Sequence, residues 1–418
     1  MRKLLSVTFM HRVSPIAVAL LSSTCFAIAC TAPAGAPTDP SSTTPSGADE
    51  GSTGAASSGT GASGQSSNGC GPSGSPTAYG EDAGASSSNA GEDAGVPARG
   101  GTGTTGSTGS SGGAAADAGT TAPPAGIDYA PYFPTWVWGG SGYAFSGLAD
   151  LQSQSGLNEV TIAFVLSNGG CNTTQDIEQN MGDVKAFLAA GGRLKASFGG
   201  ADGNYVESQC SDASSLASAL SDFVDATGIT DLDFDIEQDP METDSVNAMR
   251  GAALKMVQDS KGIKVAFTLP ANPSPGGGLT GEGISVVSHA ISAGVTVSHV
   301  NFMTMDYGDS FGGSPLAPIV IGTLNDGQGQ IKSLVSGISD ADAWGMVGVI
   351  PMIGKNDDSE VFSLDDAKNV AAFAVQNKIG LVSFWSIDRD QPGSDYNMAS
   401  TVESTNYAFN AIFQGALK

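Results

Sequence analysis

Eight strand-like runs alternate with helix-like stretches along residues 127–418, and this alternation most constrains the fold. The expected strands are 127–133, 158–166, 193–199, 229–237, 262–269, 297–305, 346–353 and 380–387. The amphipathic stretches between them include 174–190, 212–227, 242–259, 324–338 and 363–378, and a closing helix is expected at 401–416. Thr174, Asp212 and Ser363 are the expected N-caps. Eight strand–helix units predict an α/β fold, a (β/α)8 TIM barrel. A doubly wound open sheet is the alternative, but its glycine-rich phosphate fingerprint is missing.

Residues 31 to about 126 have a different composition from the rest of the chain. They are mostly Gly, Ser, Thr, Ala and Pro, with few large apolar side chains. Such a segment cannot bury enough surface to offset the loss of chain entropy on folding. We therefore expect a disordered linker at 31–126 and one large domain at 127–418.

Residues 1–30 have the pattern of a secretory signal peptide. Basic residues precede an apolar run from Val13 to Ala29, which is short for a transmembrane anchor. The run ends Ala-Ile-Ala before Cys30, which fits ordinary signal peptidase and is similar to a bacterial lipoprotein processing site. We expect a secreted or cell-surface protein, and Cys30 is the candidate lipidation site of an outer-membrane lipoprotein.

Residues 229–237 read Ile-Thr-Asp-Leu-Asp-Phe-Asp-Ile-Glu. Acidic and apolar residues alternate with the period of a β-strand, so Asp231, Asp233, Asp235 and Glu237 share one face. Carboxylates on one face of a largely buried strand repel one another and lose hydration. A polar edge strand is the alternative, but an active site that needs several carboxylates with separated pKa values explains the pattern better.

The ends of other expected strands also carry unusual side chains. In a TIM barrel the active residues lie at the C-terminal ends of the strands, so these side chains are expected to meet the carboxylates at one rim. A turn, a helix cap or core packing would explain each of them singly. The candidates are Ser197, Gly199, Met303, Asp306, Tyr307 and Trp385, with Trp136 and Trp138 after the first strand.

This set resembles the catalytic domain of glycoside hydrolase family 18, the chitinases and related endoglycosidases. Ser197-Phe198-Gly199-Gly200 is similar to the family's SxGG, Asp233-x-Asp235-x-Glu237 to its DxDxE, and Trp385 to its tryptophan on the last strand. The segments SFGG, LDFDIE, VNFMTMDYG, PMIG and FWSIDRD most resemble a prokaryotic branch that includes archaeal chitinases. The resemblance covers residues 127–418.

The resemblance implies hydrolysis of β-1,4 bonds between N-acetylglucosamine units, with the substrate's own acetamido group as nucleophile. Glu237 is then the general acid/base. Asp235 raises its pKa by repulsion and holds the acetamido N–H, while the deeper Asp233 shares a proton with Asp235. The implied substrate-binding residues are Asp306 and Tyr307 at the acetamido oxygen, Trp385 as an apolar floor, and Met303, Ser197, Gly199 and Trp136.

Two positions depart from the family pattern. The wider family often has an Asp seven residues before the catalytic Glu; this chain has Thr230 there, and Asp231 is the candidate to replace it in part. The usual Met-x-Tyr-Asp is here Met303-Thr304-Met305-Asp306, followed by Tyr307. The hydroxyl that contacts the acetamido group is therefore supplied by Tyr307 or is absent.

Two cysteines follow the second and third expected strands, whose ends are neighbours at one rim. Cys171 and Cys210 are therefore expected to form a disulfide, with two separate thiols as the alternative. Cys70, in the linker, would stay unpaired.

The net charge is −25, and residues 127–418 hold 34 acidic and 13 basic residues without clustering. This argues against nucleic acid or anionic membranes as partners, and a neutral or cationic substrate is compatible. His289 and His299 are expected to be structural, and no metal or cofactor is expected. We expect a monomer.

Two other functions remain open at this point. One is an endo-β-N-acetylglucosaminidase acting on N-glycans, which only the shape of the groove loops would separate from a chitinase. The other is a non-catalytic chitin- or glycan-binding protein on the same barrel, against which the retained Glu237 argues.

Overall fold

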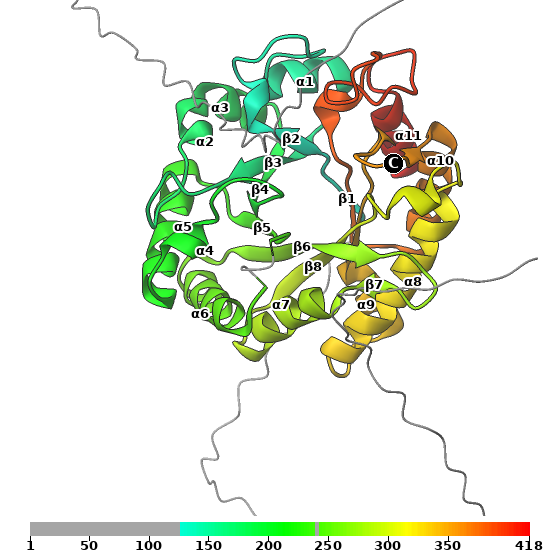
Figure 1. Cartoon of the computed structure of the whole chain (residues 1–418). Helices are drawn as coiled ribbons and strands as arrows, with labels where there is room; N and C mark the ends of the chain where they lie inside the picture. Colours follow the sequence, from blue (N-terminus) through cyan, green and yellow to red (C-terminus); the bar gives the residue numbers. More distant parts are fainter. Residues whose placement is uncertain (1–125, 239–241) are drawn as a thin grey trace, which may run out of the picture. The chain divides into compact units, whose positions relative to one another are not determined.

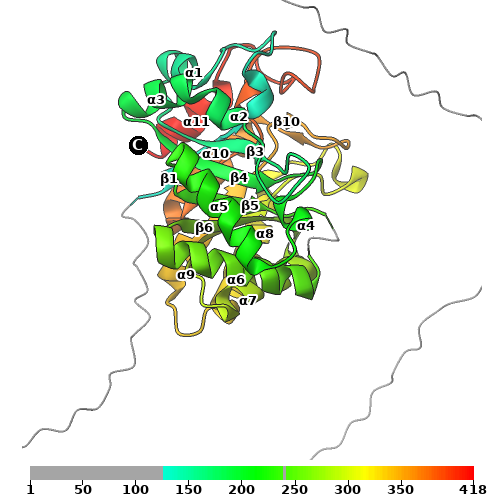
Figure 2. The ribbon, with the colours of Figure 1, turned by 90° about the vertical axis from the view of Figure 1, so that its left-hand side faces the viewer.

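The computed structural model describes residues 126–238 and 242–418. The expected signal peptide, Cys30, Cys70 and the linker up to residue 125 lie outside the described residues. Figure 1 views the domain along the axis of a ring of strands, and Figure 2 shows the same ribbon from the side, with helices covering the outside of the ring.

The ring is a parallel sheet that begins and ends with the first strand of the domain. That strand is divided into β1 (Asp128–Tyr129) and β2 (Tyr132–Pro134); β1 pairs with the last strand and β2 with the second. Between them the order is β3 (Glu159–Val165), β4 (Arg193–Gly199), β5 (Asp231–Asp235), β6 (Lys264–Asn272), β8 (Val297–Met303), β9 (Val347–Ile350) and β12 (Leu381–Val382). The two halves of the first strand close the ring, which confirms the predicted TIM barrel.

The helices of the described chain form the outer layer. They are α1 (Leu148–Ser155), α2 (Asp176–Gln179), α3 (Met181–Ala189), α4 (Val206–Gln209), α5 (Ala213–Thr227), α6 (Asp244–Lys261), α7 (Gly281–Ser292), α8 (Ala317–Leu334), α9 (Asp340–Met346), α10 (Leu364–Asn377) and α11 (Ala408–Ala416). Three short strands accompany the ring: β7 (Gly278–Leu279) pairs antiparallel with β6, and β10 (Gly354–Lys355) pairs with β11 (Val361–Phe362). None of these described helices is long and apolar enough to cross a membrane.

Two of the three expected N-caps are confirmed. Asp212 caps α5 and Ser363 caps α10, each by accepting a hydrogen bond from the third helical residue in a capping box. The prediction for Thr174 is wrong, because Gln175 precedes α2 and the Thr174 hydroxyl instead accepts a hydrogen bond from the Leu166 N–H at the end of β3.

The apolar face of β5 packs against the helical layer. Leu232 and Phe234 are fully buried, and the Phe234 ring stacks on Phe198 of β4 at 5.2 Å. Phe198 in turn meets Phe223 of α5 edge-on at 5.1 Å. Successive side chains of a strand point to opposite sides of the sheet. Because the apolar face of β5 faces the helices outside the ring, its acidic face must point into the barrel.

A charged cluster closes the opposite, N-terminal end of the barrel. The buried Lys195 ammonium lies 2.9 Å from Asp231, 3.3 Å from Asp128 and 3.4 Å from Glu159. Asp231 is the first residue of β5, so the length of the strand separates it from Glu237. Asp231 pairs with a buried lysine at the barrel base, and its partial replacement of the family's additional aspartate stays a prediction.

Candidate active site

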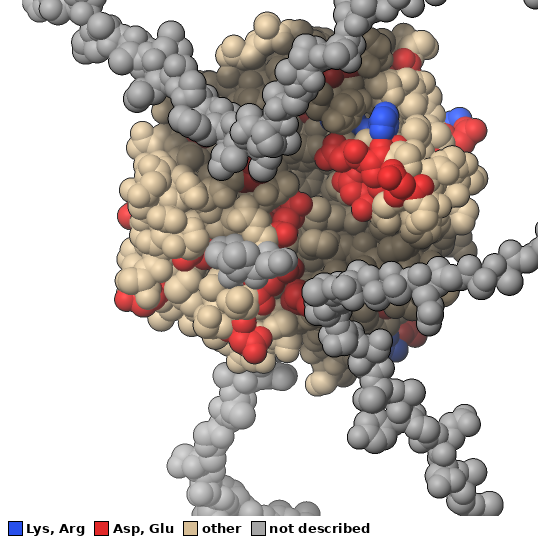
Figure 3. Space-filling view, viewed as in Figure 1, with Lys and Arg blue, Asp and Glu red and all other residues tan. Residues whose placement is uncertain are grey.

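The C-terminal ends of the barrel strands face the viewer in Figure 1. Figure 3 shows the same face as a surface, with acidic side chains around its centre and a further acidic group beside a basic side chain over the right-hand part. Asp233 and Asp235 follow one another along β5 toward this rim, and Glu237 follows two residues past the end of the strand. The structure thus brings the predicted carboxylates together at the predicted end of the barrel.

Asp233 is the deepest of the three and is held by four side chains. It accepts hydrogen bonds from Tyr132 (2.9 Å), Ser197 (2.7 Å), Thr268 (2.9 Å) and Asn301 (3.2 Å). Burial raises the pKa of Asp233, and the hydroxyl donors oppose that rise. Because every donor stabilises the ionised form, the surroundings are built for a buried carboxylate at this position.

Asp235 and Glu237 form a coupled pair above it. A hydrogen bond joins the two carboxyl groups. Burial raises the pKa of Asp235 well above its ordinary value, with the negative charges of Glu237 and Asp233 adding to it. Burial also raises the pKa of Glu237 to about 7; the hydrogen bond from Asp235 opposes this rise and the charge of Asp306 adds to it. Both carboxyl groups thus keep a proton to higher pH than an ordinary carboxylic acid does, and the sharing of a proton between Asp233 and Asp235 stays a prediction.

One oxygen of this pair has no partner. Oδ1 of Asp235 is buried and makes no hydrogen bond to any described residue. A buried acceptor without a donor costs free energy unless a ligand or water supplies one. The site therefore offers a hydrogen-bond acceptor beside the acid Glu237.

An aromatic group lines the rim next to the carboxylates. Trp385 is half-buried and stacks on Phe164 with ring centroids 5.4 Å apart. Tyr132 meets Trp385 edge-on at 5.8 Å, so the ring lies directly beside the group that holds Asp233. Trp136 also contacts Trp385, at 5.9 Å, and is 48% exposed. Trp385 and Trp136 thus present apolar surface at the rim, where we had expected a sugar platform.

Trp138 is a packing residue, which was the alternative to a place at the rim for the two tryptophans after the first strand. Its indole N–H donates to Asp183 of α3 at 2.7 Å, and its ring packs on Phe133 at 5.0 Å. This side chain fastens the loop after β2 to the helical layer and does not extend the platform.

Ser197 and Gly199 support the site from within the fold. Ser197 is fully buried and its hydroxyl donates to Asp233. Gly199 has φ +110°, and a Cβ there would lie 2.1 Å from the Asp235 carbonyl oxygen. Only glycine fits at this contact, which explains physically why this position carries one. Substrate contact by either residue stays a prediction.

The loop after β8 carries Asp306 and Tyr307. Asp306 has φ +50° and is held by two hydrogen bonds to the loop between β10 and β11. Its N–H donates to Asn356 (3.3 Å), and its carboxylate accepts from the Asp357 N–H (2.9 Å). The Tyr307 hydroxyl donates to Thr323 of α8 at 3.4 Å, so in this structure it is directed away from the carboxylates. Met303 ends β8, partly exposed. Substrate contacts of these three residues stay predictions.

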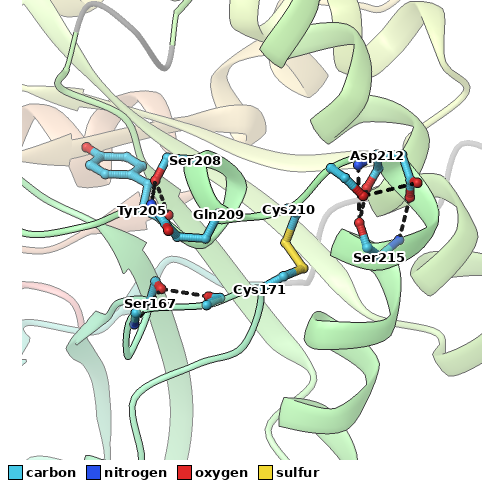
Figure 4. Close-up of a disulfide and its surroundings, with 11 residues drawn as sticks. Ser167, Cys171, Tyr205, Ser208, Gln209, Cys210, Asp212 and Ser215 are labelled. Atoms are coloured by element: carbon cyan, nitrogen blue, oxygen red, sulfur yellow. Dashed lines mark hydrogen bonds between the residues drawn. A yellow bond between two sulfur atoms is a disulfide. The ribbon is translucent and has the colours of Figure 1, made fainter.

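The disulfide prediction is confirmed. Cys171 and Cys210 are bonded with their Cα atoms 4.6 Å apart, and they join the loops that follow β3 and β4 (Figure 4).

No three His, Cys, Asp or Glu side chains of the described residues are grouped so as to hold a metal ion. His299 lies buried at the barrel base beside Lys195, and His289 contacts Ser285 on its own helix α7. Both have structural surroundings.

Sequence reasoning missed several residues that the site uses. They are Tyr132, Thr268 and Asn301 around Asp233, Phe164 under Trp385, and Tyr205 behind Glu237. The available signal was weak: all but Asn301, which lies in the middle of its expected strand, lie near the end of an expected strand or shortly beyond it, but neutral polar and aromatic residues are common there.

No family model matches the chain. Among curated proteins, the probable bifunctional chitinase/lysozyme of Escherichia coli K12 is 34% identical over 292 residues, 64% of this chain and 32% of that protein. Endochitinase 11 of Metarhizium anisopliae is 34% identical over 290 residues, 64% of this chain and 53% of that protein. The chain thus spans about a third and about half of these two relatives.

Solved structures give a fuller match. The catalytic domain of the hyperthermophilic chitinase from Pyrococcus furiosus is 32% identical, with a TM-score of 0.62, over 72% of this chain and 99% of that one. A family GH18 chitinase from Chromobacterium violaceum, 16% identical with a TM-score of 0.50 over 72% and 86% of the two chains, shares the fold. The chain therefore belongs to the chitinase catalytic domains of glycoside hydrolase family 18.

Proposed function

We propose that this protein hydrolyses β-1,4 bonds between N-acetylglucosamine units of chitin, with retention of configuration. The observation that carries the proposal is the Asp235–Glu237 pair. An acid with a pKa of about 7 stands at the rim, and beside it is a buried carboxylate oxygen that has no donor among the described residues. Relatives and solved structures named as chitinases support it.

Glu237 is the general acid in this mechanism. It protonates the oxygen of the leaving sugar, which requires that it hold a proton at the working pH. Burial supplies this requirement by raising its pKa to about 7. After the leaving sugar departs, the same carboxylate accepts a proton from the attacking water.

Asp235 orients the nucleophile. The acetamido oxygen of the substrate attacks its own anomeric carbon and displaces the leaving oxygen, and the acetamido N–H donates to Asp235. This gives Oδ1 of Asp235 a donor, which no described residue supplies. Asp233 accepts hydrogen bonds from four donors that favour its ionised form against the effect of burial, and its negative charge adds to the rise in the pKa of Asp235.

Trp385 supports the sugar ring at the cleaved bond, with the exposed Trp136 next to it. Asp306 lies near enough to influence the charge of Glu237 and is the candidate to contact the acetamido oxygen. The Tyr307 hydroxyl bonds to Thr323 and would reach the substrate only after leaving that bond.

The test uses full-length protein and soluble N-acetylglucosamine oligomers, with an N-glycoprotein in a parallel reaction and Glu237→Gln as control. We expect cleavage of the oligomers and NMR of the first products to show the β-anomer. An initial α-anomer, or efficient cleavage with glucosamine on the non-reducing side of the cleaved bond, would contradict substrate assistance. Release of glycans from the glycoprotein alone would favour an endo-β-N-acetylglucosaminidase, and binding without cleavage a glycan-binding protein.

We also propose that the protein is exported, and that it is either secreted or held at the cell surface through a lipid on Cys30. The basic and apolar pattern of residues 1–30 supports export, as does the Cys171–Cys210 disulfide, a bond typical of oxidising compartments. Mass spectrometry of the mature N-terminus distinguishes a lipidated Cys30 from a free one.

A further inference from the structure

The backbone of Glu237 is held by a side chain from another loop. The ladder of β5 ends where the Ile236 N–H donates to the Thr268 carbonyl of β6 at 3.0 Å. The next N–H, that of Glu237, lies past the end of the strand and donates to the hydroxyl of Tyr205 at 3.0 Å. The position of the acid therefore depends on a residue that precedes it by 32 positions.

The Tyr205 hydroxyl is fully committed to backbone groups of the site. Besides accepting from Glu237, it lies 2.8 Å from the Gly200 carbonyl oxygen and 3.0 Å from that of Asp235, and these two acceptors share its single proton. A phenol has one proton to donate and an oxygen that accepts, so these contacts use its hydrogen-bonding capacity. Tyr205 is 2% exposed, and burial raises the pKa of its hydroxyl, which keeps it in the neutral, donating form.

The ring of Tyr205 also fits closely against the rim. A Cβ on Gly199 would lie 2.7 Å from Cε1 of this ring as well as against the Asp235 carbonyl. The absence of a side chain at Gly199 is what allows the phenol to approach the backbone between Asp235 and Glu237. The glycine of the SxGG segment and the tyrosine are thus parts of one arrangement.

The loop that carries Tyr205 is fastened on three sides. The Cys171–Cys210 disulfide ties its end to the loop after β3, and Figure 4 shows Tyr205 and this disulfide on the same short segment. Glu207, two residues after Tyr205, forms a buried ion pair with Arg250 of α6 at 2.7 Å. The side chain of Gln238 donates to the Ala201 carbonyl at 3.2 Å, a further link between this loop and the segment after β5.

We propose that Tyr205 is a positioning residue for the catalytic acid. Its hydroxyl holds the backbone of Glu237, and the disulfide-bonded loop that carries Tyr205 holds Tyr205 in place. This inference rests on the proposed function. Protonation of a leaving oxygen requires the acid within hydrogen-bond reach of it, and a displacement of about 1 Å costs up to roughly 10²-fold in rate. Without the hydroxyl, the Glu237 N–H loses its partner at the point where the chain leaves the sheet.

The test compares Tyr205→Phe with Tyr129→Phe in full-length protein. Tyr129 is a matched control. Its hydroxyl also makes a hydrogen bond to a residue far away in the sequence, Asn410, but this bond involves no residue of the site. The first readout is amide hydrogen exchange at Glu237 in protein labelled with ¹⁵N-glutamate, with the signal assigned by its loss in Glu237→Gln. The second is the pH profile of kcat and KM on N-acetylglucosamine oligomers.

For Tyr205→Phe we expect amide exchange at Glu237 to quicken at least ~10-fold, because the Glu237 N–H loses the hydroxyl that accepts its hydrogen bond. We expect kcat to fall roughly 10- to 100-fold, with KM within about twofold and an altered alkaline midpoint. Tyr129→Phe should change neither the exchange nor the pH profile.

Unchanged exchange at Glu237 in Tyr205→Phe, or quicker exchange with unchanged kcat and pH profile, overturns the role of Tyr205. A loss of activity that merely follows the unfolded fraction, with the wild-type midpoint, overturns it as well. If the wild type cleaves no oligomer while exchange at Glu237 still quickens, the proposed function fails and the positioning of a catalytic acid fails with it, although the contact stands.

Discussion

The raised pKa of Glu237 predicts an alkaline limit of activity near neutrality. The acid must be protonated to act, and burial raises its pKa from 4.5 to about 7. At pH 6 a group with a pKa of 7 is ~90% protonated and one with a pKa of 4.5 only ~3%, so the shift enlarges the active fraction about 30-fold. The assay is kcat/KM on a soluble N-acetylglucosamine oligomer between pH 4 and pH 9, which reports the free enzyme. We expect the alkaline midpoint near pH 7, and a midpoint near 4.5 would refute the reasoning.

A charge neutralisation tests the cause of that shift. Asp202 is exposed, and its negative charge is among those that raise the pKa of Glu237. An exposed charge interacts only weakly with a neighbouring group through water, so Asp202→Asn should lower the alkaline midpoint by about a few tenths of a pH unit. The effect should vanish in ~1 M salt, where the Debye length is about 3 Å. Asp222→Asn, an exposed change on the outer helix α5, is the control. An equal shift in both variants would show that net charge, and not the site, is responsible.

Three further results are expected. Glu237→Gln should lose roughly 10²–10⁴-fold in kcat but still bind oligomers, as calorimetry would show; near-normal turnover would remove Glu237 from the mechanism. Replacing both Cys171 and Cys210 by Ser opens a loop of 39 residues and should lower the free energy of unfolding by up to about 4 kcal/mol in denaturant titrations; an unchanged midpoint would refute this. Burial lowers the pKa of His299 to about 4, below the 6.5 of an unfolded chain, so stability should fall between pH 6.5 and pH 4 by on the order of 3 kcal/mol. His299→Gln should lose that part of the pH dependence, and an undiminished slope would assign it to the carboxylates.

The alternation at residues 229–237 predicted both the strand and the direction of its carboxylates. It could do so because Leu232 and Phe234 have only one apolar layer to enter, which forces Asp233 and Asp235 inward. Strand 193–199 matches β4 at both ends. The expected helix at 324–338 starts instead at Ala317, with Pro318 in its first turn, a start signal that the amphipathic window did not include.

The neighbours of the carboxylates were beyond the reach of sequence patterns. Thr268 and Asn301 meet Asp233 only through the register of β5, β6 and β8, in which Thr268 pairs with both Asp235 and Asn301. Register between distant parallel strands is set by the whole ring and leaves no local signal. Likewise, the hydroxyl of Tyr307 turns to Thr323 on α8, and side-chain direction in a loop does not follow a period.

The divided first strand has a consequence for how this domain can be made. Among the described strands β1 pairs only with β12, and the hydroxyl of Ser383 donates to the Ala130 carbonyl across 253 positions of sequence. A nascent chain that has not yet reached Leu381 therefore has two open strand edges, on β1 and on β9, and no ring. Open edges invite pairing with other chains, and contacts so distant in sequence form slowly. Residues 381–418 are thus needed to close the barrel, so truncation before Leu381 should give aggregation and not a smaller enzyme.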